Sequence, residues 1–264
     1  MKKQRLKLMM MLWLVVLAAS VSAGFAAEDA SKPHFIWTYE DCVEPAKMET
    51  YLKAHIGMAK LSAEHKFEFP FLTYVDQFQV YTCGIFGSFA QLDAYPQVTE
   101  AMNEKTSGRS KRMSEQMAKC VRHCSTSIAM YRSDLSFEPK EPAFTPDFSK
   151  PFYQMAVFYY IKPDKYEEAQ VAAQKIKQLH EQKQVPWGYM LYEILCGDGV
   201  PAFVTINIAK DKMDFLKLDK NNQEKLGEDL KQLADDYVHV IKKMDVREGT
   251  FVPEASYVPE GTFE

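Results

Sequence analysis

Val43-Glu44-Pro45-Ala46-Lys47-Met48-Glu49 returns in similar form as Ile161-Lys162-Pro163-Asp164-Lys165-Tyr166-Glu167, 118 positions further along the chain. A second pair of segments, 131–139 and 251–259, lies 120 positions apart and ends in Ser136-Phe137-Glu138-Pro139 and in Ser256-Tyr257-Val258-Pro259. Two units of similar length therefore begin and end alike. Solenoid repeats span only about 20–50 residues, so a unit of this length is a small domain. We expect a tandem duplication, with repeat 1 at 33–139, a proline-rich connector at 140–150 and repeat 2 at 151–259.

Both repeats show the same predicted order of strands and helices. An apolar first strand, near 34–39 and 152–161, leads to Pro45 or Pro163, which suits the first turn of a helix. Two strands follow, at 70–76 and 79–86 in repeat 1 and at 188–195 and 202–208 in repeat 2. A short helix, a longer helix and a last strand, near 126–131 and 247–252, complete the order β-α-β-β-α-β. This is the ferredoxin-like order, and the predicted fold class is α+β.

Three short motifs support these boundaries. Cys196-Gly197-Asp198-Gly199 is a hairpin turn signal between the two middle strands of repeat 2. Ser88 with Gln91 forms a capping box at the start of the second helical region of repeat 1. Asp211 with Asp214 occupies the equivalent place in repeat 2. The second helical region is therefore expected to begin at the same point in both repeats.

This arrangement resembles the dimeric α/β-barrel superfamily, which has antibiotic-biosynthesis-monooxygenase-like, NIPSNAP-like, muconolactone-isomerase-like and haem-handling branches. The resemblance rests on the Pro-x-Lys-x-Glu turn after the first strand, the hairpin, and the recurrence of both in the two repeats. It implies that two four-stranded sheets close a barrel within one chain, with helices outside and with each tail crossing to the other repeat. The superfamily includes enzymes, haem binders and members without an assigned activity, so the fold alone does not select a function.

The first residues are typical of an export signal. Lys2, Lys3, Arg5 and Lys7 precede an apolar run at 8–19, which is shorter than a membrane span, and small residues follow. We expect a signal peptide at 1–23, or cut instead after Ala26, and a periplasmic or secreted bacterial protein. An uncleaved N-terminal anchor is the alternative, and no stable membrane insertion is expected once the signal is removed.

Charge and cysteine content limit the partners. Removing residues 1–23 takes away four of the 32 basic residues and none of the 36 acidic ones, so the mature chain is acidic and nucleic acid is not an expected partner.

The cysteines number five, so they cannot all pair within one chain. Five residues form one stripe at helical spacing: Met113, Met117, Cys120, Val121 and Cys124. This stripe predicts that Cys120 and Cys124 are reduced and buried, with His123 off the stripe. No metal site is expected, because no second ligand pair has zinc-site spacing.

Candidate catalytic residues are few. His55 lies on an apolar helical stripe and is interpreted either as a haem ligand or proton-transfer group, or as a histidine that is hydrogen-bonded at a helix–sheet contact. We favour the second interpretation, because Ala173 stands at the equivalent position of repeat 2. His55, Tyr74 and Glu193 are the first residues to test for catalysis. Haem-degrading relatives use an Asn, a Trp and a His together, and no matching asparagine motif is present here.

Aromatic residues dominate the strands and supply the ligand-binding candidates: Tyr39, Tyr81, Tyr160, Trp187 and Tyr192. Most strand aromatics are expected to be core, but an incompletely filled barrel would bind a small hydrophobic or aromatic ligand. Our leading hypothesis is therefore an exported ligand-binding protein. The alternatives are a cofactor-independent monooxygenase or haem-handling enzyme, and an interaction protein with a filled barrel. No resident cofactor is expected outside the haem alternative, and further homo-oligomerisation is left open.

Overall fold

The computed structural model describes residues 35–259 and 262. The predicted export signal at 1–23 lies outside these residues, as do the first positions of repeat 1. Among the residues that the structure describes, no helix is both long enough and apolar enough to cross a membrane.

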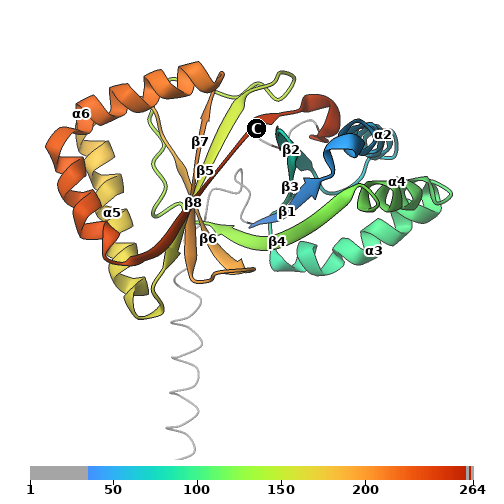
Figure 1. Ribbon diagram of the computed structural model, residues 1–264, viewed down its shortest axis with the longest axis horizontal. Coiled ribbons are helices and arrows are strands. Elements are labelled where there is room, and N and C mark those ends of the chain that lie inside the picture. The colour runs from blue at the N-terminus through green and yellow to red at the C-terminus, as the bar shows by residue number, and fades with distance from the viewer. Residues whose placement is uncertain (1–34, 260–261, 263–264) are drawn as a thin grey trace, which may run out of the picture. The chain divides into compact units, whose positions relative to one another are not determined.

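The order of elements confirms the predicted fold class (Figure 1). Repeat 1 contains β1 (Phe35–Val43), the 3-10 turn η1 (Pro45–Lys47), α2 (Met48–Glu64), β2 (Phe71–Asp76), β3 (Gln79–Phe86), α3 (Phe89–Lys105), α4 (Arg109–Ala118) and β4 (Val121–Tyr131). Repeat 2 contains β5 (Tyr153–Ile161), η2 (Pro163–Lys165), α5 (Tyr166–Lys183), β6 (Met190–Cys196), β7 (Ala202–Ala209), α6 (Lys212–Val238), β8 (Ile241–Phe251) and η3 (Pro253–Ala255). Each repeat is therefore a ferredoxin-like unit.

All of these strands form one closed antiparallel barrel in the order β1-β3-β2-β8-β5-β7-β6-β4. Each repeat contributes four adjacent strands, and the repeats join where β2 pairs with β8 and where β6 pairs with β4. The last strand of one repeat thus pairs with the second strand of the other. Closure removes the exposed sheet edges that a single repeat would present.

The tails after β4 and β8 cross to the other repeat, as the resemblance implied. Phe137 forms a bridge with Tyr189 at the start of β6, and Tyr257 forms the equivalent bridge with Phe71 at the start of β2. The two serines complete the match. Ser136 Oγ accepts a hydrogen bond from Leu191 N at 2.8 Å, and Ser256 Oγ accepts one from Thr73 N at 2.9 Å. In Figure 1 the turn η3 accordingly lies beside α2 of repeat 1.

Apolar side chains fill both surfaces of the sheet. Under the helices of repeat 2, α5 and α6 cover a cluster that includes Ile161, Phe203 and Leu226. Inside the barrel, Ala156, Tyr192 and Val204 belong to a second cluster. Strand alternation separates the two sets, because neighbouring residues of a strand point to opposite faces.

The helix caps were predicted correctly, but the helix lengths were not. Ser88 Oγ accepts from Gln91 N, and Asp211 Oδ1 accepts from Asp214 N at 2.8 Å. In repeat 1 the first helix, α3, is longer than α4, which reverses the expected order. In repeat 2 both parts are merged in α6, with non-helical backbone angles at Gly227.

The predicted helical stripe that contains the cysteines is wrong. Helix α4 ends at Ala118, and β4 begins at Val121. Cys120 is buried as expected, but Cys124 lies on β4 and is exposed. Its backbone pairs with β1, opposite Asp41. Pairing with β1 therefore decides the conformation of a segment that helical spacing alone assigns to a helix.

Candidate functional site

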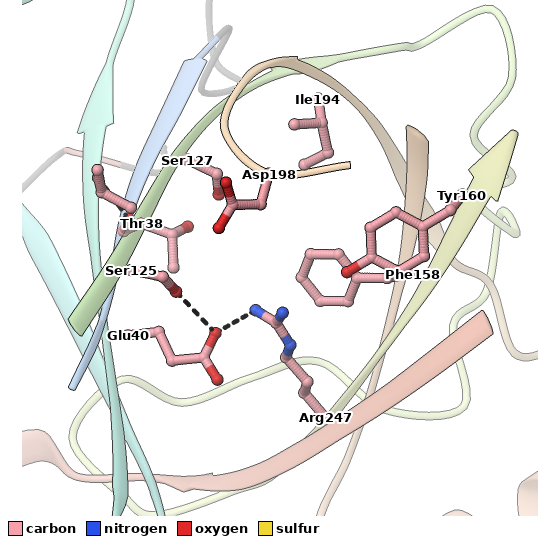
Figure 2. Close-up of a pocket in the computed structure, with 10 residues that line it drawn as sticks. Thr38, Glu40, Ser125, Ser127, Phe158, Tyr160, Ile194, Asp198 and Arg247 are labelled. Carbon is pink, nitrogen blue, oxygen red and sulfur yellow. Dashed lines mark hydrogen bonds and ion pairs between the residues drawn. The ribbon is translucent and has the colours of Figure 1, made fainter. Parts of the chain in front are cut away.

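A pocket opens inside the barrel, where side chains of both repeats meet (Figure 2). Its cavity volume is about 60 Å³. Its lining residues come from β1, β4, β5, β6, the β6–β7 turn and β8: Thr38, Glu40, Ser125, Thr126, Ser127, Phe158, Tyr160, Ile194, Asp198 and Arg247. The pocket is therefore small and largely polar, in contrast to the apolar interior around it.

An ion pair between the repeats crosses this pocket. Arg247 on β8 donates through Nη1 to Glu40 on β1. Ser125 Oγ donates to the same carboxylate at 3.4 Å. The guanidinium also stacks on Phe158, with its central carbon 4.1 Å from the ring centroid. Both charged groups are largely shielded from solvent, with side-chain exposures of 26% for Arg247 and 20% for Glu40.

The hydrogen-bonding capacity of Arg247 is mostly unused. A guanidinium carries five N–H donors, and Glu40 is the one hydrogen-bond acceptor that it has among the described residues. Figure 2 shows the group pointing into the pocket, with Glu40 on one side of it. Several donors are thus directed towards space that a ligand can occupy.

The turn between β6 and β7 covers part of the pocket. This turn spans residues 197–201, whereas the equivalent β2–β3 turn consists of Gln77 and Phe78 alone. Glycine is required where the turn meets the pocket wall. A Cβ atom on Gly199, which has φ +81°, would lie 2.5 Å from the ring of Tyr160. The longer turn brings Asp198 to the pocket, and no described residue forms a hydrogen bond or ion pair with its carboxylate.

The pocket surrounds the pseudo-two-fold axis that relates the repeats. Glu40 and Phe158 occupy equivalent positions on β1 and β5, and Ser127 and Arg247 occupy equivalent positions on β4 and β8. All four residues line the same pocket. The repeats have therefore diverged at the positions where their side chains meet.

Three of the five predicted ligand-binding residues lie inside the barrel. Tyr160 lines the pocket. Tyr81 lies close to the pocket residue Glu40. Burial first, and then the negative charge of Glu40, raise the pKa of Tyr81 to about 12. Tyr192 is packed in the interior cluster, and burial raises its pKa.

The other two lie on the outer surface of the sheet. Tyr39 is 37% exposed and stacks on Trp37, with ring centroids 5.1 Å apart. Trp187 is buried between α6 and the sheet, where its Nε1 donates to Ile208 O at 2.7 Å.

The three catalytic candidates lie apart from one another, and none of them lines the pocket. His55 is buried between α2 and β2, with Nε2 3.3 Å from Thr73 Oγ1, and burial lowers its pKa to about 4. This is the helix–sheet contact that we favoured. Tyr74 is packed against Phe152 and Phe251 inside the barrel, and burial raises its pKa.

Glu193 lies on the outer face of β6 in a polar network. Its carboxylate accepts hydrogen bonds from Arg132 Nη1 at 2.6 Å and from the hydroxyl of Tyr166. Arg132 also forms an ion pair with Asp134 at 2.7 Å. The equivalent of Glu193 in repeat 1 is Val75, so this network, which joins the tail of repeat 1 to β6 and α5 of repeat 2, has no counterpart on the other side of the barrel.

Sequence reasoning missed the charged residues of the pocket: Glu40, Asp198 and Arg247. One signal was present. Glu40 follows the aromatic start of the first strand, and the phase of that strand places it on the same face as Thr38. A charged residue on the inner face of a predicted barrel needs a partner, which would have directed attention to Arg247.

This pocket does not fit a haem group. No histidine lines it, and it is far smaller than the roughly 300–1,000 Å³ of sites that enclose larger ligands. His55, which the haem alternative would use as a ligand, faces the helix side of β2. In the part of the chain that the structure describes, no group of three or more His, Cys, Asp or Glu residues is arranged to hold a metal ion.

No family model and no curated protein matches the sequence. Solved structures do share its fold. An anthrone oxidase-like protein has a TM-score of 0.55 and 11% identity, with 87% of this chain and 93% of that chain covered. A monooxygenase-like protein from Lactobacillus acidophilus NCFM has a TM-score of 0.53 and 10% identity, with coverage of 85% and 96%. A chlorite dismutase mutant from Candidatus Nitrospira defluvii has a TM-score of 0.51 and 11% identity, with coverage of 85% and 94%. The chain thus has a tandem ferredoxin-like α/β-barrel fold.

Proposed function

We propose that the protein binds a small molecule through a carboxylate group, in the pocket inside the barrel. The observation that carries this proposal is the unused donor capacity of Arg247, which a planar carboxylate matches with two parallel hydrogen bonds. Glu40 and Phe158 hold the guanidinium in place, so little conformational entropy is lost when a ligand binds.

The proposed ligand is more polar than the hydrophobic or aromatic molecule that the sequence indicated. Tyr160, Phe158 and Ile194 supply an apolar wall, but hydroxyl and charged groups supply the rest of the lining. About 60 Å³ holds only a few heavy atoms, whereas an engineered cavity of about 150 Å³ is needed to enclose benzene. A small carboxylate fits wholly, and a larger one leaves part of itself at the pocket opening.

The test is a binding panel of carboxylates, each compared with its own amide. Propionate, benzoate and L-alanine are titrated calorimetrically beside propionamide, benzamide and L-alaninamide. We expect at least one carboxylate to bind more tightly than its amide. Arg247→Gln should weaken that binding by about 10- to 100-fold, the equivalent of a lost charge-assisted hydrogen bond. Equal binding of acid and amide in every pair would refute the proposal.

Lys242→Gln is the matched control for the binding panel. It removes one positive charge from the same strand, but Lys242 is exposed and is not among the residues that line the pocket. Arg247→Gln leaves Glu40 without its cation, so the melting temperature of each variant is measured first. Glu40→Gln, which keeps the guanidinium, provides a second variant that still binds the carboxylate.

Oxidation of the bound molecule is the second candidate function. It is favoured by the two carboxylates in the pocket, Glu40 and Asp198, which are groups that can accept a proton from a bound substrate. Proteins with this fold include an anthrone oxidase-like protein and a monooxygenase-like protein. Oxygen consumption with the most tightly bound carboxylate of the panel as the probe, absent in Glu40→Gln and Asp198→Asn, would support this function. No oxygen uptake above that of buffer would exclude it for that substrate.

A further inference from the structure

We infer that the ligand is a zwitterion of the α-amino acid class, with its ammonium group bound by Asp198 and its carboxylate by Arg247. This inference rests on the proposed function, because it concerns the same pocket. It adds the second charged group of the ligand and the residue that recognises it.

The charges of the pocket do not balance without a cation. Glu40 and Asp198 contribute two negative charges, and Arg247 contributes one positive charge. No other lining residue is charged at neutral pH. A simple carboxylate would bring a third negative charge beside a single guanidinium, and like charges at short range repel one another. A ligand with its own ammonium group adds no net charge, and it supplies the cation next to the unpaired carboxylate.

Asp198 is placed at the mouth of the pocket, where it can receive that ammonium group. Glu40 already has Arg247 as its counter-ion and accepts a hydrogen bond from Ser125. Asp198 is exposed, its carboxylate forms no hydrogen bond or ion pair with another described residue, and Figure 2 shows it beside Ser127, with Arg247 on the other side of the pocket. Two groups that can each accept a ligand contact therefore have opposite charges and line the same pocket. A ligand that carries both complementary charges on a few atoms satisfies them together.

The turn that carries Asp198 is specific to repeat 2. It is three residues longer than its counterpart, five residues at 197–201 against two at 77–78. Its backbone is packed on Tyr160 at Gly199, so the turn is held against the pocket wall. The extra length thus adds a carboxylate to a pocket that already contains the site for the ligand's carboxylate.

The limited volume selects amino acids with small side chains. The roughly 60 Å³ of the pocket must hold the ammonium and the carboxylate groups first. Glycine, L-alanine and L-serine are the smallest members of this class, and the hydroxyl of Ser127 lines the pocket, where a polar side chain could reach it. Bulky side chains must extend through the opening.

L-Alanine and two fragments of it test the inference by calorimetry on the full mature chain. Propionate lacks the amino group, and ethylamine lacks the carboxylate. We expect L-alanine to bind more tightly than either fragment. Because an ion pair with an exposed carboxylate is weak, Asp198→Asn should weaken L-alanine binding about 2- to 5-fold and leave propionate binding unchanged or stronger. Asp235→Asn, an exposed position on α6, is the matched control.

Each outcome separates the inference from the proposed function. If propionate binds as tightly as L-alanine and Asp198→Asn changes neither, the zwitterion inference fails while carboxylate binding stands. Both fail if ethylamine is the one compound that binds. Both also fail if no compound binds, or if Arg247→Gln does not change the binding of any compound. Tighter binding of L-alanine that requires both Asp198 and Arg247 supports both.

Discussion

The crossing tails should stabilise the barrel through two equivalent serines. Ser136 is buried, and its hydroxyl donates to Arg132 O at 2.8 Å while it accepts from Leu191 N at 2.8 Å. Ser136→Ala removes both bonds and leaves a buried N–H without a partner, which destabilises by about 1–3 kcal/mol. For a domain of this size, about 2–4 °C is lost for each kcal/mol, so the melting temperature should fall by about 2–12 °C.

Repeat 2 supplies an internal check on this value. Ser256 accepts from Thr73 N and donates to Val252 O, which are the equivalent contacts. Ser256→Ala should therefore produce a loss of similar size, and the double variant should lose the sum, because the two serines share no partner. Ser133→Ala, an exposed serine on the first tail, is the matched control. The assay is chemical denaturation followed by circular dichroism. If Ser136→Ala and Ser256→Ala both unfold at the midpoint of Ser133→Ala, the tails do not hold the repeats together.

Three further predictions concern other contacts. Tyr257→Ala should lower the free energy of unfolding by about 1–3 kcal/mol, measured by denaturation, because it removes ring packing and the hydrogen bond to Phe67 O. Burial lowers the pKa of His55 to about 4, so between pH 4 and about 6.5 the unfolded state binds a proton that the folded state does not. The free energy of unfolding should therefore decrease as the pH falls from about 6.5 towards 4, by at most about 3 kcal/mol. His55→Gln should flatten this dependence. In the native protein, a thiol reagent such as Ellman's should react with the exposed Cys124 and Cys196. Cys83 shares the inner face of β3 with Tyr81, and burial raises the pKa of its thiol to about 11, so it should react only after unfolding. Rapid labelling of Cys83 in the native protein would contradict this placement.

Local signals and the internal repeat were sufficient to predict most of the fold. The strands expected at 79–86 and 202–208 are found at Gln79–Phe86 and Ala202–Ala209, because their apolar residues face both the helices and the barrel interior. The two tails were predicted from a repeated Ser-aromatic-x-Pro pattern, and each makes the same contacts with the other repeat. The duplication allowed weak signals in one copy to be checked against the other.

The first halves of the last strands were not predicted, because no hydrophobic alternation marks them. The strands β4 and β8 begin at Val121 and Ile241, several residues before the expected starts at 126 and 247. Most of their early residues are exposed, so the pattern of a half-buried strand is missing. Without that signal, helical spacing extended the preceding helices too far. Backbone pairing with β1 and β5 decides the conformation of these segments.

Divergence about the pseudo-two-fold axis also determines how a ligand can be oriented. In a barrel made of two identical protomers, any site on the axis presents each group twice, and a ligand without symmetry binds equally well in two opposite orientations. Here Arg247 faces Glu40, while the equivalent positions hold Ser127 and Phe158. A single guanidinium and a single long turn define one head and one tail for the bound molecule. Fusion of the two halves into one chain therefore gives this barrel a polarity that a homodimer of either half lacks.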